Sequence, residues 1–290
     1  MKKLVIAVVS VALALVAVEP AHAQNVVIPA SEKVLAVIDT AIDSQEVKSV
    51  IYEACFTQNK SCPNKSNFME GTGAASSPAW PSSISHDVYH GHNMVQSALF
   101  YDPTVKIVFV RIANINFTDL ASLNAELSIV QAIDWVSKNA SKYSIDAVSI
   151  SQAGPNLSSC TRNASIINSV ATLTSQNIPV FAATGNNSTA TSVQPVRFPA
   201  CVDGIVGVGS IKSDLSGLAT ATNAGVGLDV VAQGTLSIMR YKRNVPATIS
   251  GTSVSTQIAA AIYVKNSATL SFNSLLPKLP KVLGYPYISN

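Results

Sequence analysis

The sequence predicts an α/β fold in which a doubly wound, mostly parallel sheet carries helices on both faces. Strand-like and helix-like segments alternate over residues 33–265, which is the pattern of such a sheet. Residues 34–38 are apolar at every position, as expected of a parallel strand that is covered on both sides. Apolar residues make up 48% of the 290-residue chain, so a domain of this size can bury a sizeable core.

The expected elements follow that first strand, which ends at Asp39. Apolar residues at 94, 95, 98 and 99 form the stripe of a helix that begins near His90. Helical patterns return over residues 122–138, 164–173 and 254–263, and strand patterns over residues 106–112, 147–150, 179–183, 205–208 and 228–231.

Two stretches break this alternation. Residues 56–83 are rich in Ser, Pro, Asn, Lys and Gly, and this composition predicts a long surface excursion. The tail after residue 270 carries three prolines and little periodicity, so we expect it to lie along the surface.

Composition excludes one class of function. Only 12% of the residues are charged and the formal net charge is +3, which is too little for the basic surface of a nucleic-acid-binding protein. We therefore expect no nucleic-acid partner.

Residues 1–23 predict a secretory signal peptide. Two lysines precede an apolar run over residues 4–18, and Ala-His-Ala precedes Gln24. The run is shorter than the roughly 20 residues that a spanning helix needs, which argues against the alternative, an uncleaved membrane anchor. We expect a mature domain over residues 24–290 that is secreted, extracellular or periplasmic, and not bound to a membrane after cleavage.

Export places the four cysteines in a compartment where disulfides persist, and four cysteines allow three pairings. We favour Cys55 with Cys62, which closes a short polar loop, and Cys160 with Cys201. Unpaired buried thiols are the alternative.

Three residues supply the groups of a nucleophilic serine hydrolase. A serine hydroxyl is a poor nucleophile unless an imidazole takes its proton, and the imidazole needs a carboxylate that fixes its tautomer. Asp39 follows a strand directly, while His90 and Ser253 each open a helix. The carboxyl ends of strands form the ligand crevice of doubly wound sheets, so we expect the three side chains to meet there. Taken alone, each is also suited to a helix cap or turn.

Four ordered motifs resemble those of the subtilisin-like serine proteases, the subtilases. In chain order, residues 37–43 resemble the family's aspartate segment, residues 90–92 its histidine segment, residues 182–186 its oxyanion-asparagine segment and residues 251–257 its serine segment. Residues 146–151 are similar to the family's substrate-pairing strand, and residues 198–200 and 228–234 are similar to segments between its asparagine and serine boxes. The resemblance spans about residues 33–265 and adds the subtilisin-like topology to the predicted fold class.

The resemblance implies a serine endopeptidase that hydrolyses peptide or protein substrates through an acyl-enzyme. It implies catalytic roles for Asp39, His90 and Ser253, with the oxyanion held by Asn186 and the Ser253 N–H. The implied substrate-binding residues are Ser151, Gln152, Ala153, Gly154, Ala183, Thr184, Gly185 and Arg197. The second favoured cysteine pair would join two segments that flank this cleft.

Arg197 falls where the family places the floor of the pocket for the side chain before the cleaved bond. A cation there would attract an acidic side chain or occupy the pocket itself, and a displaced surface arginine is the alternative. The mechanism implies no cofactor. Calcium sites are common in the family, but the sequence contains no acidic loop compact enough to assign one, and we assign no metal ligand.

The sequence departs from the family pattern at His92 and Asn93, after the histidine motif, and at Gln257, where a proline usually ends the serine box. These departures favour one alternative, a subtilase-like binding protein with impaired catalysis. A second alternative is a zinc hydrolase that uses His86, His90 and His92, but it leaves the asparagine and serine motifs without roles. About ten residues separate the expected cleavage site from the first strand, so we expect folding unaided or with a separate folding or inhibitor partner.

Overall fold

The computed structural model describes residues 32–76, 90–113, 123–154, 160, 164–239, 245–266 and 271–289. Its centre is a ten-stranded sheet with the strand order β11-β12-β8-β7-β6-β5-β1-β4-β2-β3. The parallel strands are β1 (Val34–Asp39), β2 (Val50–Phe56), β4 (Lys106–Arg111), β5 (Ala147–Ile150), β6 (Val180–Ala183), β7 (Ile205–Ile211), β8 (Val230–Gln233) and β12 (Tyr285–Ile288). The edge strands β3 (Phe68–Glu70) and β11 (Lys281–Val282) run antiparallel to their neighbours.

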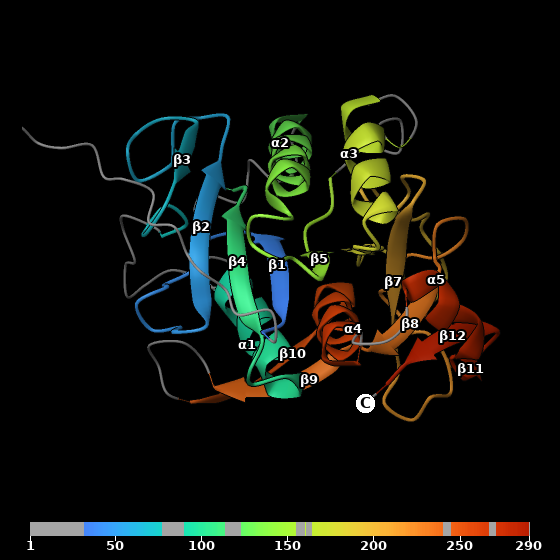
Figure 1. The fold of residues 1–290 in the computed structure, drawn as a ribbon. Coiled ribbons are helices and arrows are strands. Elements are labelled where there is room, and N and C mark those ends of the chain that lie inside the picture. Colours follow the sequence, from blue (N-terminus) through green and yellow to red (C-terminus); the bar gives the residue numbers. More distant parts are fainter. Residues whose placement is uncertain are drawn as a thin grey trace, which may run out of the picture.

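Helices cover both faces of the sheet, as the doubly wound prediction requires (Figure 1). On one face lie α2 (Leu123–Asn139) and α3 (Ala164–Ser175), which pack against each other. On the other face lie α1 (His90–Tyr101) and α4 (Thr252–Asn266). A hydrophobic core fills each interface, so the strands between them are buried on both sides.

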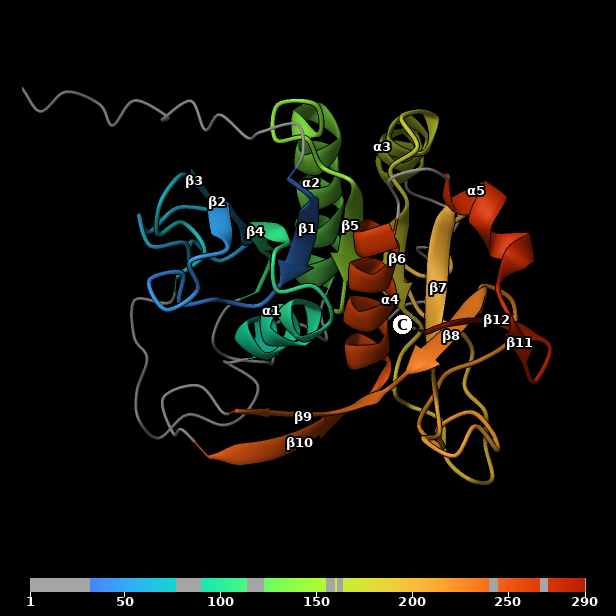
Figure 2. The same ribbon diagram turned by 60° about the horizontal axis from the view of Figure 1, so that its bottom comes forward.

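The helix α4 is buried almost all round. Its residues 252 and 254–264 are buried, and it contacts α1 and the strands β5 to β8. Alanines at 259, 260 and 261 let it lie close to the sheet. Beneath α1 and α4 runs a separate antiparallel hairpin of β9 (Thr235–Met239) and β10 (Pro246–Ser250), which leads directly into α4 (Figure 2).

The chain reverses its direction of travel across the sheet at β1. This strand pairs with β4 on one side and with β5 on the other, and the later strands continue outward from β5. Ligands of open α/β sheets bind at the carboxyl ends of the strands beside such a reversal. Asp39 at the end of β1 and Ser151 just after β5 therefore lie where a site is expected.

All ten predicted strands and helices are present, with ends that differ by a few residues. The structure adds elements in the two stretches that broke the pattern. Residues 68–70 of the predicted surface excursion form β3, and the part of that stretch beyond residue 76 lies outside the described residues. The tail is more regular than expected, because β12 pairs with β8 and extends the sheet after the short helices α5 (Phe272–Leu275) and η4 (Leu276–Lys278).

Both favoured disulfides are formed. Cys55 is bonded to Cys62, and Cys160 is bonded to Cys201. Within the described ranges, no helix is long and apolar enough to cross a membrane. The expected signal peptide, residues 1–23, lies outside those ranges.

Candidate active site

Asp39 and His90 meet at the carboxyl edge of the sheet. Asp39 ends β1 and is fully buried, while His90 is the first residue of α1, with a side chain that is 25% exposed. His90 Nδ1 lies 2.7 Å from Asp39 Oδ1. A carboxylate at this distance favours the imidazole tautomer with its proton on Nδ1, which leaves Nε2 able to accept a proton.

The residues beside this pair fix the position of the helix. Thr40 N donates to Asp39 Oδ1 at 2.6 Å, and Thr40 Oγ1 accepts from Gly91 N at 2.9 Å, so one threonine ties β1 to the start of α1. A Cβ on Gly91 would lie 2.7 Å from the ring of Phe109 and 2.8 Å from Ala41 O. The glycine after His90 is therefore needed for the close approach of helix and strand.

Ser253 lies in the first turn of α4 and contacts the end of β5. Its Oγ donates to Ser151 O at 2.9 Å, and Ser151 Oγ donates back to Ser253 O at 3.0 Å. The next residue, Gln152, contacts the other two predicted residues: its Nε2 is 3.0 Å from Asp39 Oδ1 and 2.9 Å from His90 Nδ1. The dipeptide Ser151-Gln152 thus connects Ser253 to the Asp39–His90 pair.

Gln257, where the family pattern has proline, joins the same network from inside α4. Its Nε2 donates to Ser151 Oγ at 2.9 Å, and its Oε1 accepts from Ser149 Oγ at 3.1 Å. All three side chains are buried. Both ends of the amide are hydrogen-bonded, so the departure from the pattern anchors α4 to β5 instead of disturbing it.

Asn186, in the loop after β6, contacts Thr252, the residue before Ser253. Its Oδ1 accepts from Thr252 N at 2.9 Å and from Thr252 Oγ1 at 3.1 Å, and the residue is exposed. A Cβ on Gly251, which has φ of +133°, would lie within 3.4 Å of the Asn186 side chain. The glycine of the serine motif therefore leaves room for the asparagine beside the start of α4.

Asn223 holds the loop that carries Asn186, a role that the sequence did not suggest. Its Oδ1 accepts from Asn187 N at 2.8 Å and from Ser188 N at 3.1 Å, and its own N–H donates to Gly185 O at 3.0 Å. An asparagine followed by Ala-Gly is typical of a turn, so no signal in the sequence separates this residue from other turn residues.

The two segments predicted as walls of a substrate pocket are joined by one turn. Gly154 N donates to Phe198 O at 2.8 Å, and Arg197 N donates to Thr184 O at 3.1 Å. The Arg197 side chain packs on Gly185, where a Cβ would lie 3.4 Å from Arg197 Cδ. Arg197 is thus half-buried beside the loop that carries Asn186.

The histidines do not resemble a metal centre in the part of the chain that the structure describes. His90 and His92 are two residues apart on one helix, so their side chains point in different directions. His92 is buried, which lowers its pKa to about 4, and its Nε2 lies 3.2 Å from Gln96 Nε2. No group of three metal-ligating side chains occurs among the described residues, and His86 lies outside them.

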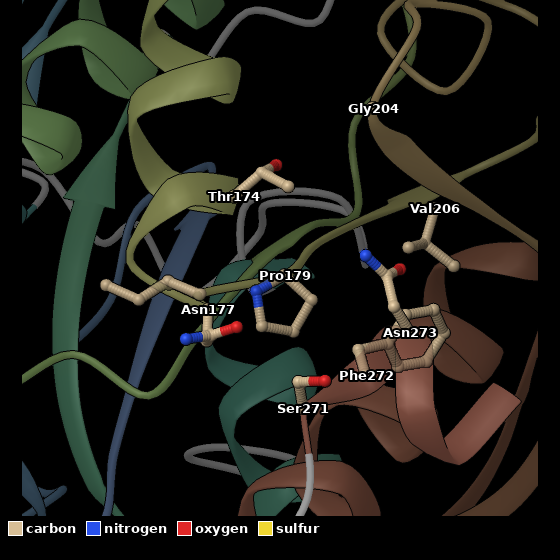
Figure 3. A pocket seen from close by; sticks show the side chains of 9 residues that line it. Thr174, Asn177, Pro179, Gly204, Val206, Ser271, Phe272 and Asn273 are labelled. Atoms are coloured by element: carbon tan, nitrogen blue, oxygen red, sulfur yellow. The ribbon is translucent and has the colours of Figure 1, made fainter.

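A separate pocket lies at the opposite edge of the sheet. Figure 3 shows the side chains that line it, which include Thr174, Asn177, Pro179, Gly204, Val206, Ser271, Phe272 and Asn273. Pro179 and Gly204 precede β6 and β7, so this pocket opens at the amino ends of the strands, away from Asp39 and Ser253.

A family model agrees with this geometry. The model described as the subtilase family, Peptidase_S8, matches residues 30–269, which is most of the chain. The chain belongs to the subtilase family. Membership makes this subtilase a serine protease at the level of the family, with peptides or proteins as the class of substrate.

Relatives of this subtilase support the assignment. Subtilisin DY of Bacillus licheniformis is 26% identical over 198 residues, which cover 66% of this chain and 68% of that protein. Among solved structures, a protease from Pseudoalteromonas arctica has a TM-score of 0.63 at 17% identity, over 88% of this chain and 85% of that chain. The prenylagaramide maturation protease PagA has a TM-score of 0.60 at 17% identity, over 86% and 84% of the two chains. These structural matches support the fold.

Proposed function

We propose that this subtilase is a secreted serine endopeptidase in which Asp39, His90 and Ser253 form the catalytic triad. The observation that carries the proposal is the 2.7 Å contact between His90 Nδ1 and the fully buried Asp39 carboxylate, joined to Ser253 through Ser151-Gln152. The expectation of secretion rests on residues 1–23 of the sequence.

The proposed reaction uses groups of the chain and one water molecule. Ser253 Oγ attacks the carbonyl carbon of the peptide while His90 Nε2 takes its proton, and Asp39 stabilises the resulting imidazolium. The C–N bond then breaks as His90 gives that proton to the departing amine. Water repeats the sequence on the acyl-enzyme and releases the carboxylic acid. No step needs a metal or another cofactor.

Asn186 and the Ser253 N–H are the proposed donors to the oxyanion. Thr252 N and Thr252 Oγ1 both donate to Asn186 Oδ1, so the Nδ2 group of the same amide points away from Thr252. No described residue accepts a hydrogen bond from Nδ2. A donor held in this way needs no reorientation when negative charge develops on the carbonyl oxygen.

The substrate main chain is proposed to lie between Ser151–Gly154 and Ala183–Gly185. The turn at 197–198, which hydrogen-bonds to both segments, would close the pocket between them. The half-buried Arg197 beside Gly185 would then face the side chain that precedes the cleaved bond, and its positive charge favours an acidic side chain there.

The labelling reaction of a fluorophosphonate tests the proposal. Purified protein should be labelled at Ser253 and should cleave denatured protein, and Ser253→Ala should remove both signals while the circular dichroism spectrum stays unchanged. Folded wild-type protein that gives neither signal would support the impaired binding protein instead. Hydrolysis that is abolished by excess EDTA, without labelling of Ser253, would support the zinc hydrolase.

A further inference from the structure

Gln152 reaches from the end of β5 into the contact between Asp39 and His90. Its Nε2 is 3.0 Å from Asp39 Oδ1 and 2.9 Å from His90 Nδ1, and the residue is only 8% exposed. We propose that Gln152 is a positioning residue that shares the Asp39 carboxylate with His90 and thereby sets the acid limit of activity. This inference rests on the proposed function.

The charges around the amide fix its orientation. Asp39 Oδ1 can only accept, so Gln152 presents its NH₂ group, because the opposite orientation would set two acceptor oxygens against each other. His90 Nδ1 also faces Asp39 Oδ1, at 2.7 Å, and therefore carries its proton. The 2.9 Å contact between Gln152 Nε2 and His90 Nδ1 is then the approach of two donors to the same oxygen and not a hydrogen bond between them. With Thr40 N at 2.6 Å, three donors share one carboxylate oxygen.

Sharing weakens the attraction that Asp39 exerts on protonated His90. Each additional donor reduces the negative charge that the imidazolium meets, so the charged imidazole is stabilised less. His90 then loses its proton, and becomes a base, at a lower pH than it would beside an unshared carboxylate. The contact also holds Asp39 Oδ1 beside Nδ1, because Gln152 is itself enclosed in the protein.

Among the residues that the structure describes, two further ionisable groups near Asp39 and His90 keep their charge state over the relevant pH range. Arg111 on β4 is the register partner of Asp39, and burial lowers its pKa only to about 10, so it remains cationic. His92 on α1 has a pKa of about 4 because it is buried, so it remains neutral. Asp43, in the loop after β1, raises the pKa of His92, but the effect of burial on that pKa is larger.

The test is the pH profile of kcat/KM for a peptide substrate, measured for variants in a His86→Gln background so that His90 alone accounts for the acid limb. Gln152→Met keeps the length of the side chain and removes the donor, and it should move the acid limb up by about 0.5 to 1 pH unit. Gln152→Glu keeps the shape and adds a negative charge, and it should move the limb up by about 1 to 3 units. Gln131→Met, at an exposed position of α2, is the matched control and should leave the limb in place.

A purely structural role makes a different prediction. If Gln152 has only a structural role, its variants should lose kcat or stability while the acid limb stays at the wild-type pH. That result, obtained with an active enzyme, would overturn this inference and leave the proposed function intact. Gln152→Glu provides the same readout if the methionine variant does not fold. Wild-type protein without hydrolysis at any pH overturns the proposed function and this inference together.

Discussion

Asn186 uses the two ends of its amide in different directions. Oδ1 accepts from the N–H and the hydroxyl of Thr252, and the Nδ2 group is the proposed donor to the oxyanion. Asn223 fixes the loop from behind through the backbone of Asn187 and Ser188. An oriented donor of this kind acts on the transition state and adds little to ground-state binding of the substrate.

Asn186→Leu should therefore lower kcat by about 100-fold to 1000-fold with little change in KM. Steady-state kinetics on a peptide substrate measure both constants. The matched control is Asn187→Leu, because the neighbouring side chain is exposed and only its backbone N–H contacts Asn223. Equal losses in the two variants would assign the effect to the loop and contradict a role for the Asn186 amide.

At the scale of elements, the contact of α4 with β5 positions Ser253. The buried amide of Gln257 bridges Ser149 and Ser151, and Ser151 in turn exchanges two hydrogen bonds with Ser253. Removing the amide leaves two buried hydroxyl groups with fewer partners, which typically costs about 1 to 3 kcal/mol.

Gln257→Leu should lower the free energy of unfolding by about 1 to 3 kcal/mol and should also lower kcat, because the turn that carries Ser253 loses its anchor on β5. Urea denaturation and kinetics measure the two effects. Ser149→Ala removes one partner of the same amide, so the double variant should lose less than the two single variants together. Strict additivity would show that the hydrogen-bond network does not act as a unit.

The sequence predicted the elements that have strong periodicity, and it missed those that depend on distant partners. The strand β2 contains Glu53, which interrupts its apolar pattern, yet this carboxylate is buried because Gly73 N and Ala75 N both donate to it at 2.9 Å. The strand β12 is short and contains Pro286, which suits only a sheet edge.

The residues of the candidate site also divide into those that the sequence predicted and those that it missed. Asp39, His90 and Ser253 could be proposed from the sequence, because the chemistry of a serine hydrolase needs these residue types and the fold places the ends of strands and helices at its site. The contacts of Gln152 and Gln257 were not, because a buried amide is specified by the partners that the fold brings to it and leaves no periodic signal in the sequence.

At the scale of the whole molecule, the two disulfides constrain different parts of the chain. The Cys55–Cys62 bond spans 7 residues and lies in a buried corner at the sheet edge, whereas Cys160–Cys201 spans 41 residues. The longer loop includes Asn186 and ends at the turn that hydrogen-bonds to Gly154 and Thr184. The loss of loop-closure entropy in the unfolded chain predicts stabilisation of about 2.5 kcal/mol for the short loop and about 4 kcal/mol for the long one.

Replacing both cysteines of a pair by serine should separate these effects. The variant without Cys160–Cys201 should lose more stability in urea denaturation and should also show a raised KM, because the turn that joins the two proposed walls is no longer tethered. The variant without Cys55–Cys62 should lose less stability and keep the wild-type KM, since that bond lies on β2, away from the proposed walls. A larger loss for the short loop, or equal KM values in the two variants, would contradict the proposed coupling between the long disulfide and the substrate site.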